Sequence, residues 1–437
     1  MVWRWRPGRV LALGARGKRV RTLQETLAAL GFDPGPIDGV YGLLTRQAVR
    51  ECQRRYGLVA DGVAGPQLHR LFREPALRLG PSQALLGLLP PGEAGPWARW
   101  AGAYPALSAF VWSSRLASWE PARIELAAKA WSHQLAEAGA GTPAAPPWIW
   151  RLTFGPPQGA EAPAGNDREG TEAGRRPEEF PLPWSGPGRR ARRALVAAIT
   201  SVVDRFRPLG VDLDLEPVWP GEGRRWVHLL AALRPLLERR GRLLMATRDL
   251  SRRPRIRPAW ADDLPMGLLL QQVHLLILAR RAVAGLSPPG PLGTAALAGL
   301  LAGLGRAHAY KVLVELPLEA LRWTQGEDQP LTGPDPVPYR EAKVAAITHG
   351  RRIEWDDEVG AASFRLRRGS RVEQYWLPSV RSVERLLEQV RARRLAGVVL
   401  APLGAEDPRL SRFLPGPLHP WRPTQAGPGD IPPAAGA

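Results

Sequence analysis

From residue 84 onward, short apolar runs alternate with longer stretches in which apolar residues recur at helical spacing. The short runs have the length of β-strands, and the longer stretches have the length of amphipathic helices. The predicted strands are 84–89, 107–112, 148–154, 209–216, 242–247, 273–279, 311–316 and 396–401. The predicted helices include 121–138, 190–206, 224–240 and 380–394. Eight strands that alternate with helices predict an α/β fold, a closed parallel (β/α)8 or TIM barrel.

Other segments divide the chain around this barrel. We expect a small helical domain at 1–72, a linker at 73–81, the barrel at 82–415 and a flexible tail at 416–437. Residues 155–188 are rich in Gly, Pro and Glu, which predicts a long surface loop. Residues 325–380 interrupt the last β/α unit, so we expect an insertion there with strands of its own.

The first eighty residues contain a weak internal repeat. The motif at 38–42, Asp-Gly-Val-Tyr-Gly, returns at 61–65 as Asp-Gly-Val-Ala-Gly, and each copy follows a helical pattern. Gly31 and Gly57 stand where the helices are expected to end, and Asp-Gly pairs favour tight turns. The pattern predicts a small domain of about three short helices joined by two similar turns.

Charge narrows the choice of partners. The formal net charge is +19, and the positive residues are almost all Arg, which favours anionic partners. The sequence contains no zinc finger, basic heptad region or RNA-binding aromatic motif, so nucleic acid is not expected as a partner. Peptidoglycan carboxylates and anionic wall polymers are the other candidates, and a soluble protein with a basic surface is the plainer alternative.

Other residue types exclude several classes of protein. The single cysteine, Cys52, falls at an apolar helical position, so we expect a core residue and no disulfide within the chain. The histidines show no ligand spacing, so neither a metal site nor a cofactor is expected. Residues 1–20 are basic and lack a long apolar core, so no signal peptide is predicted. No apolar run is long enough to span a bilayer.

The stretch 209–217, Leu-Gly-Val-Asp-Leu-Asp-Leu-Glu-Pro, has the most informative polar pattern. Side chains alternate across a strand, so Asp212, Asp214 and Glu216 share one face. Three carboxylates inside a barrel are costly unless they are hydrogen-bonded or partly protonated, and their repulsion favours a raised pKa suited to a general acid. The row ends at the carboxyl end of its strand, which is the catalytic face of such barrels. A half-exposed strand or a divalent-cation site would produce the same alternation.

The repeat region resembles the peptidoglycan-binding domain 1 family. The matching positions are Gly17, Val20, Leu23, Gln24, Leu27, Leu30, Gly31, Ile37, Asp38, Gly39, Tyr41, Gly42, Thr45, Ala48, Val49, Gln53, Gly57, Leu58, Asp61, Gly62 and Gly65. That family is a three-helix wall-targeting module, so the resemblance implies binding to peptidoglycan and not catalysis. A small helical bundle of another role is the alternative.

The carboxylate strand resembles the DGxDxDxE signature of glycoside hydrolase family 18, the chitinase type, over residues 210–216. The flanking chain, about 82–415, is similar to spore cortex-lytic N-acetylglucosaminidases. The resemblance implies that Glu216 protonates the glycosidic oxygen while the N-acetyl oxygen of the substrate attacks the anomeric carbon. It also implies that Asp214 orients the acetamido group and that Asp212 supports Asp214.

Three positions depart from the family pattern. Leu209 replaces the first Asp of the signature, Ala279 stands where strand six usually ends in a Tyr-Asp pair, and Ala401 stands where strand eight usually presents a Trp. Loss of an aromatic sugar contact weakens transition-state binding. The candidate substrate-binding aromatic residues are Trp219, Tyr375 and Trp376, for which packing is the alternative role.

The sequence therefore predicts a peptidoglycan-binding glycoside hydrolase. We expect it to cleave N-acetylglucosamine linkages in cell wall or spore cortex by substrate-assisted, retaining catalysis, and to be associated with the wall or the spore. The alternative is a catalytically degenerate barrel that acts as a glycan-binding wall or spore-coat protein. A secreted chitin-degrading enzyme is a third hypothesis, which the wall-binding module and the lack of an export signal disfavour.

Overall fold

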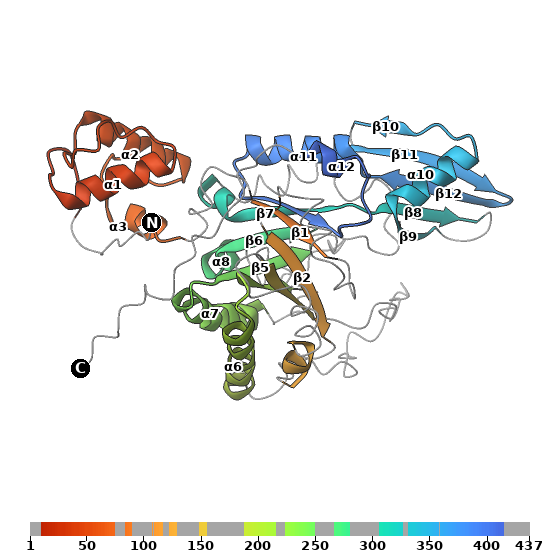
Figure 1. Ribbon diagram of the computed structural model, residues 1–437, viewed down its shortest axis with the longest axis horizontal. Coiled ribbons are helices and arrows are strands. Elements are labelled where there is room, and N and C mark those ends of the chain that lie inside the picture. Colours follow the sequence, from red (N-terminus) through yellow and green to blue (C-terminus); the bar gives the residue numbers. More distant parts are fainter. Residues whose placement is uncertain are drawn as a thin grey trace, which may run out of the picture.

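The computed structural model describes most of the two expected regions. The described residues are 10–74, 84–89, 107, 109–116, 122–128, 148–154, 188–215, 223–249, 266–279, 306–326, 331–357 and 359–414. The predictions for Glu216, Trp219, the loop up to residue 187 and the tail lie outside these residues. In the described part, a helical domain, a barrel and a small sheet follow one another across the molecule (Figure 1).

The helical domain consists of α1 (Lys18–Ala29), α2 (Leu43–Arg55) and α3 (Pro66–Leu71). The apolar faces predicted from the sequence meet in one core, in which Val20, Leu23 and Val49 are fully buried. Cys52 belongs to the same core, and burial raises the pKa of its thiol to about 12. The thiol is therefore a packed apolar group, as the helical pattern predicts.

The sequence repeat is also a repeat of hydrogen bonds. Nε2 of Gln24 donates to Oδ1 of Asp38 at 3.1 Å, and its Oε1 accepts the backbone N–H of Gly39 at 2.9 Å. Gln53 makes the same two bonds in the turn at 61–62, at 2.7 Å and 2.8 Å. Both turn glycines have positive φ, which Gly adopts without strain. A buried amide thus fixes each Asp-Gly turn to the helix before it.

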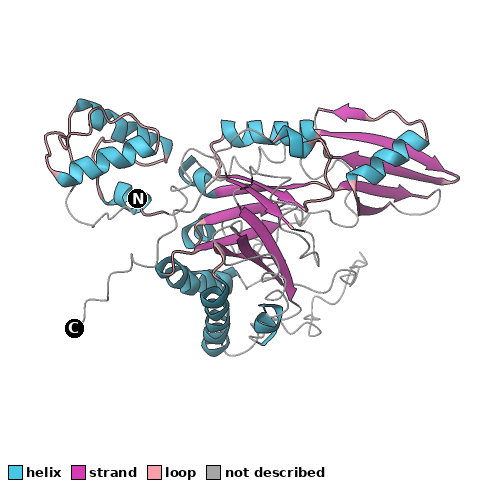
Figure 2. Cartoon of the chain, in the orientation of Figure 1, coloured by secondary structure: helices cyan, strands magenta, loops and turns pink. Residues whose placement is uncertain are grey.

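Eight parallel strands close into a barrel, so the predicted fold class is confirmed. In barrel order the strands are β1 (Ala84–Leu88), β13 (Gly397–Ala401), β7 (Val312–Pro317), β6 (Leu275–Ala279), β5 (Leu243–Asp249), β4 (Gly210–Leu215), β3 (Trp148–Phe154) and β2 (Ala109–Leu116). The predicted strands agree within a few residues; the largest shift is in β2, which ends four residues after the predicted 112. Helices cover the outside of the barrel (Figure 2).

The covering helices meet the outer faces of the strands. They are α6 (Gly188–Phe206), α7 (Gly223–Arg239), α8 (Met266–Gln272) and α11 (Val380–Ala392). Leu195 of α6, Leu233 of α7 and Leu387 of α11 join the outward-facing strand residues in one apolar cluster. No described helix has both the length and the apolar character needed to span a membrane.

The barrel interior changes character along its axis. Toward the amino ends of the strands it is apolar and includes Ile149, Met245 and Leu313. Toward the carboxyl ends of β2, β3, β4, β5 and β7 the described inward-facing side chains are polar, and they are Ser113, Arg151, Thr153, Asp212, Asp214, Thr247 and Glu315. Because active sites in this fold lie at the carboxyl ends, this polar half is where a functional site is expected.

Gly210 starts the strand that carries the acidic row. A Cβ at this position would lie 2.8 Å from the carbonyl oxygen of Leu243 on β5. Real Cβ atoms do not approach backbone oxygen so closely, so only Gly allows β4 and β5 to pair at this register. The glycine of the signature thus has a packing reason that is independent of any reaction.

A five-stranded antiparallel sheet extends from the barrel. Its order is β10 (Glu354–Asp356), β11 (Ala361–Arg368), β12 (Arg371–Leu377), β8 (Ala320–Gln325) and β9 (Thr332–Val337), with α10 (Tyr339–Thr348) packed on it. The predicted insertion began at 325, but the sheet begins at Ala320, directly after β7. The expected start is later because β8 is a short strand of mixed apolar and polar residues, which no turn residue separates from β7 apart from Pro317.

The helical domain is joined to the amino-terminal end of the barrel. Glu74, which follows α3, lies 3.1 Å from Nζ of Lys311 and 3.1 Å from Nη2 of Arg234. The ring of Tyr56 meets that of Tyr310 edge-on, with centroids 5.2 Å apart. Tyr310 and Lys311 lie in η2 (Arg306–Lys311), immediately before β7. The helical domain and the small sheet therefore lie on opposite sides of the barrel (Figure 1).

Candidate active site

The candidate site is built on β4. Asp212 and Asp214 both point into the barrel, and both are 0% exposed. They share a face because residues two apart in a strand point the same way. Glu216, the next residue with the same parity, lies outside the described residues. The structure thus confirms that the acidic row lines the interior at least as far as Asp214.

Asp212 is held by two donors on one oxygen. Nε of Arg151, on the neighbouring strand β3, donates to Oδ2 at 2.7 Å. Oγ1 of Thr247, on β5, donates to the same Oδ2 at 2.8 Å. Three adjacent strands therefore fix the orientation of this carboxyl group.

The guanidinium of Arg151 also crosses the barrel interior. Its Nη1 donates to Oε2 of Glu315 on β7 at 2.7 Å, although three strands separate β3 from β7 in the sheet. The exposed fraction is 1% for Arg151 and 6% for Glu315. Arg151 is thus a buried cation between two carboxylates from opposite sides of the barrel.

These contacts determine the electrostatics of the site. Burial raises the pKa of Asp212, while the adjacent guanidinium of Arg151 opposes that rise and Asp214 adds to it. Burial disfavours the charged form of Arg151, but Glu315 and Asp212 outweigh this effect and raise its pKa above the usual range. A buried ion of either sign needs such a partner, because its removal from water costs on the order of several kcal/mol.

Asp214 receives a separate donor. Oγ1 of Thr153 on β3 donates to its Oδ2 at 2.9 Å, and the Thr153 hydroxyl lies 3.2 Å from that of Ser113 on β2. Hydroxyl groups are both donors and acceptors, so this chain can adjust to either charge state of the carboxyl. Asp212 and Asp214 are therefore close in sequence but differ in environment: the first faces a cation and the second faces hydroxyls.

The three departures from the family pattern are all buried. Leu209 belongs to the apolar interior cluster just below the polar half. Ala279 and Ala401 close the carboxyl ends of β6 and β13, with exposed fractions of 0% and 5%. Neither side chain offers a ring or a hydroxyl to a sugar at these two strand ends.

Tyr375 and Trp376 lie in β12 of the small sheet, with exposed fractions of only 3% and 6%. The Tyr375 ring stacks on Phe364 at 4.6 Å, and its hydroxyl donates to Glu373 at 2.9 Å. Trp376 packs in an apolar cluster that includes Trp323. These are the contacts of core residues, and the burial leaves little ring area for a sugar. Trp219, the third aromatic candidate, lies outside the described residues.

Within the described part of the chain, no group of three or more His, Cys, Asp or Glu side chains could hold a metal ion. The divalent-cation reading of the acidic row also meets a physical objection. The guanidinium of Arg151 already lies 2.7 Å from Asp212, where a cation would bind. The arrangement therefore favours acid-base chemistry by the carboxyl groups over ligation of a metal.

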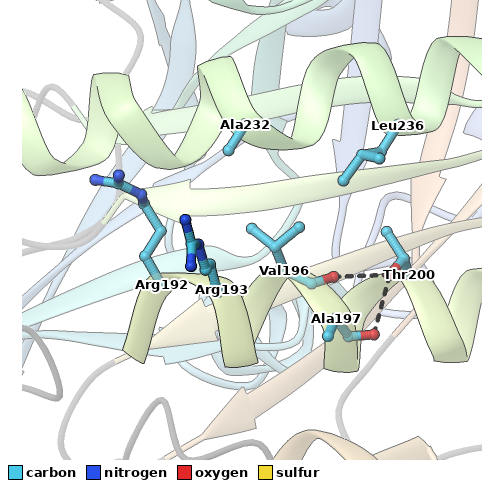
Figure 3. A pocket seen from close by; sticks show the side chains of 7 residues that line it. All are labelled: Arg192, Arg193, Val196, Ala197, Thr200, Ala232 and Leu236. Atoms are coloured by element: carbon cyan, nitrogen blue, oxygen red, sulfur yellow. Dashed lines mark hydrogen bonds between the residues drawn. The ribbon is translucent and has the colours of Figure 1, made fainter. Parts of the chain in front are cut away.

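A groove between α6 and α7 on the outside of the barrel offers no comparable chemistry (Figure 3). The groove is lined by Arg192, Arg193, Val196, Ala197, Thr200, Ala232 and Leu236. The Thr200 hydroxyl donates to carbonyl oxygens of its own helix. The charged groups that line the groove are the guanidinium groups of Arg192 and Arg193, and the lining contains no carboxylate. This groove is thus separate from the acidic row.

Four residues of the site were not predicted from the sequence, namely Arg151, Thr153, Thr247 and Glu315. Only Arg151 gave a recognisable signal. It interrupts the apolar run Trp-Ile-Trp-Arg-Leu at 148–152, where a strand buried on both faces should contain no charge. A lone Arg in such a strand indicates an acidic partner inside the fold.

Comparison with known proteins finds relatives of the helical domain and structures similar in fold to the barrel. Residues 16–71 match the family described as "Putative peptidoglycan binding domain". Over 54 residues the chain is 50% identical to the N-acetylmuramoyl-L-alanine amidase CwlM of Mycobacterium tuberculosis, which is 12% of this chain and 13% of that protein. It is 40% identical over 63 residues to a spore cortex-lytic enzyme of Bacillus cereus, which is 14% of this chain and 24% of that one. The chain thus spans less than a quarter of these relatives, and the likeness concerns the helical domain.

The barrel is similar in fold to solved structures that include a spore cortex-lytic enzyme and a chitinase. The Bacillus cereus spore cortex-lytic enzyme SleL superposes with a TM-score of 0.56 at 13% identity, over 76% of this chain and 73% of that chain. A chitinase from Chromobacterium violaceum superposes with a TM-score of 0.56 at 15% identity, over 76% of this chain and 98% of that chain. The resemblance to a peptidoglycan-binding module and to a chitinase-type barrel is therefore confirmed, and at this identity the second likeness is one of fold.

Proposed function

We propose that this protein is a peptidoglycan-binding glycoside hydrolase that cleaves N-acetylglucosamine linkages by substrate-assisted, retaining catalysis. The observation that carries the proposal is the burial of Asp212 and Asp214 in the polar half of the barrel, each held by donors from neighbouring strands. In the sequence the row continues to Glu216, the residue after β4, and barrel enzymes place their catalytic groups at the carboxyl ends of the strands.

Each carboxyl group has a distinct role in the proposed reaction. Glu216 protonates the glycosidic oxygen, and the N-acetyl oxygen of the substrate attacks the anomeric carbon to form an oxazolinium ion. Asp214 orients the acetamido group and stabilises its developing positive charge. Asp212, fixed by Arg151 and Thr247, supports Asp214 from the side of the apolar interior. Glu216 then activates a water molecule, which opens the oxazolinium ring with net retention.

The helical domain holds the enzyme on its substrate. Its match to the peptidoglycan-binding family supports binding to the wall, and the match over 16–71 includes both Asp-Gly turns. We therefore place the protein at the cell wall or the spore cortex. Such tethering raises the effective concentration of the barrel near glycan strands.

The proposal is tested by digestion of purified spore cortex and vegetative peptidoglycan, with mass analysis of the products. The variants are wild type, Glu216→Gln and, as a matched control, Glu384→Gln, whose side chain is exposed on α11. New N-acetylglucosamine reducing ends from wild type and the control, but not from Glu216→Gln, are expected. Products of equal amount from Glu216→Gln would remove Glu216 as the acid.

A second candidate function is glycan binding without hydrolysis. The small buried residues Ala279 and Ala401 at the ends of β6 and β13 favour it, because neither supplies the aromatic or hydroxyl contacts of an active barrel. In that case no protein releases products from either wall preparation, while wild type still sediments with peptidoglycan.

A further inference from the structure

The most unusual group in the barrel interior is the guanidinium of Arg151. Its charged neighbours come from β4 and β7: Asp212 lies at 2.7 Å, Glu315 at 2.7 Å, and Asp214 contributes a weaker Coulomb interaction. Thr247 on β5 contributes an uncharged donor to Asp212. Among the described side chains that face inward from β1, β2, β6 and β13, none is titratable.

The hydrogen bonds identify where a proton on Asp212 would have to lie. Arg151 and Thr247 both donate to Oδ2, and a guanidinium has no acceptor, so Oδ2 is the unprotonated oxygen. Oδ1 has no hydrogen-bond partner among the described residues. Any proton of Asp212 therefore lies on Oδ1, away from Arg151. Because the guanidinium stabilises the charged carboxylate, Arg151 disfavours this protonation.

Charge balance gives Glu315 a role as well. Arg151 supplies one positive charge against three buried carboxyl groups, so its position decides which of them are compensated. Glu315 accepts a hydrogen bond from Nη1 of Arg151, so the guanidinium extends across the interior and is shared between Glu315 and Asp212. The strength of the field at Asp212 thus depends on how the guanidinium is shared between the two sides.

We propose that Arg151 is a positioning residue that holds Asp212 ionised and correctly oriented beside Asp214, and that Glu315 anchors Arg151 and moderates its effect. The inference rests on the proposed hydrolase function, in which Asp212 supports Asp214. Arg151 acts through Asp212 and does not itself touch the substrate. A purely structural staple between β3, β4 and β7 is the competing explanation, since buried ion pairs also fix register.

The two explanations differ in the pH dependence of hydrolysis. Removal of the cation in Arg151→Met makes Asp212 harder to ionise, so the acidic limb of kcat/KM moves to higher pH by about one unit or more. Glu315→Gln leaves the guanidinium to Asp212 alone, so the same limb moves to lower pH. Arg151→Lys keeps the charge and restores most of the wild-type profile. A structural staple predicts loss of stability or rate without these opposite shifts.

A second measurement does not require activity. Glu315→Gln is compared with the double variant Arg151→Met/Glu315→Gln, so that the two proteins differ only in the cation beside Asp212. The unfolding free energy of each is measured against pH. A carboxyl whose folded pKa is raised makes stability fall as pH rises from the unfolded value, about 3.9, through the folded value. Without Arg151 the folded pKa is higher, so the fall continues to higher pH in the double variant.

Arg352→Met serves as the matched control, because Arg352 is exposed between α10 and β10, outside the barrel. It should alter neither the pH profile nor the pH dependence of stability. Opposite movements of the acidic limb, with a stability difference that grows with pH, support the inference. Unmoved limbs and a pH-independent stability difference overturn it. If wild type releases no products at any pH, the proposed hydrolase function fails, and the stability comparison still decides whether Arg151 holds Asp212 ionised.

Discussion

The carboxylate of Glu74 lies 3.1 Å from Nζ of Lys311 and joins the helical domain to the barrel. Lys311 is only 3% exposed, and its ammonium group also donates to two backbone carbonyl oxygens at 3.3 Å. Burial lowers the pKa of Lys311, and Glu74 opposes that effect. Because Lys311 precedes β7, the helical domain is fixed at the end of the barrel opposite to the acidic row.

Glu74→Gln should destabilise the full chain by roughly 2 kcal/mol, because Lys311 and Arg234 would lose their shared carboxylate in a largely buried interface. Denaturant-induced unfolding measures the change. Asp204→Asn is the control, since it breaks an exposed pair with Arg240 and should cost less than about 1 kcal/mol. Equal losses in the two variants would show that Glu74 does not stabilise the interface.

Gln24→Leu should unfold the helical domain before the barrel. The side chain makes hydrogen bonds to the turn at 38–40, and their loss leaves buried backbone groups unsatisfied at a cost of about 2 to 3 kcal/mol. We expect weaker co-sedimentation with peptidoglycan and an earlier melting transition of this domain. Gln47→Leu, at an exposed position of α2, is the control and should bind the wall as wild type does. The prediction would be contradicted if Gln24→Leu bound peptidoglycan as well as wild type does and its helical domain melted at the wild-type temperature.

Thr153→Val should lower kcat/KM about tenfold, which corresponds to roughly 1.4 kcal/mol of transition-state stabilisation. The substitution keeps the shape of the side chain and removes the hydroxyl that donates to Asp214 at 2.9 Å. Steady-state hydrolysis of soluble peptidoglycan fragments provides the measurement. Thr200→Val on α6 removes a hydroxyl that bonds only to its own helix, and this variant should keep the wild-type rate. A wild-type rate for Thr153→Val would mean that this hydroxyl does not orient Asp214.

His274 should make the protein less stable as the pH falls from 7 to 5. Its Nδ1 accepts the N–H of Leu244 at 2.7 Å, so Nε2 carries the proton donated to Glu238 at 3.0 Å and the ring is neutral. Burial lowers the pKa of His274, so below about 6.5 the unfolded chain binds more protons than the folded one and stability is lost. Glu238, whose pKa is lowered to about 2, stays ionised throughout this range.

His274→Asn keeps an acceptor for Leu244 and removes the titration, so its unfolding free energy should vary less between pH 7 and 5 than that of wild type. The largest difference in slope for one proton is about 1.4 kcal/mol per pH unit. His349→Asn, at an exposed position after α10, is the control and should follow wild type. Parallel curves for wild type and His274→Asn would exclude His274 as the titrating group.

The sequence by itself determined the local structure and the acidic row. Apolar runs of strand length predicted all eight barrel strands, because burial on both faces demands continuous apolar character except at functional positions. The alternation at 212–214 placed two carboxyl groups on the inner face for the simple reason that strands have a period of two. The repeated Asp-Gly turns indicated the helical domain, since both glycines need positive φ.

Only the tertiary structure decided what surrounds those groups. Glu315 lies 164 residues from Arg151 in the chain, and no local pattern connects the two. Closure of the barrel brings β3, β4, β5 and β7 around one interior, and this proximity gives Asp212 its cation and its hydroxyl donor. Folding of the small sheet likewise buried Tyr375 and Trp376, whose aromatic character alone suggested sugar contacts. Periodicity fixes which face a side chain occupies, whereas the partners across that face depend on how distant strands are assembled.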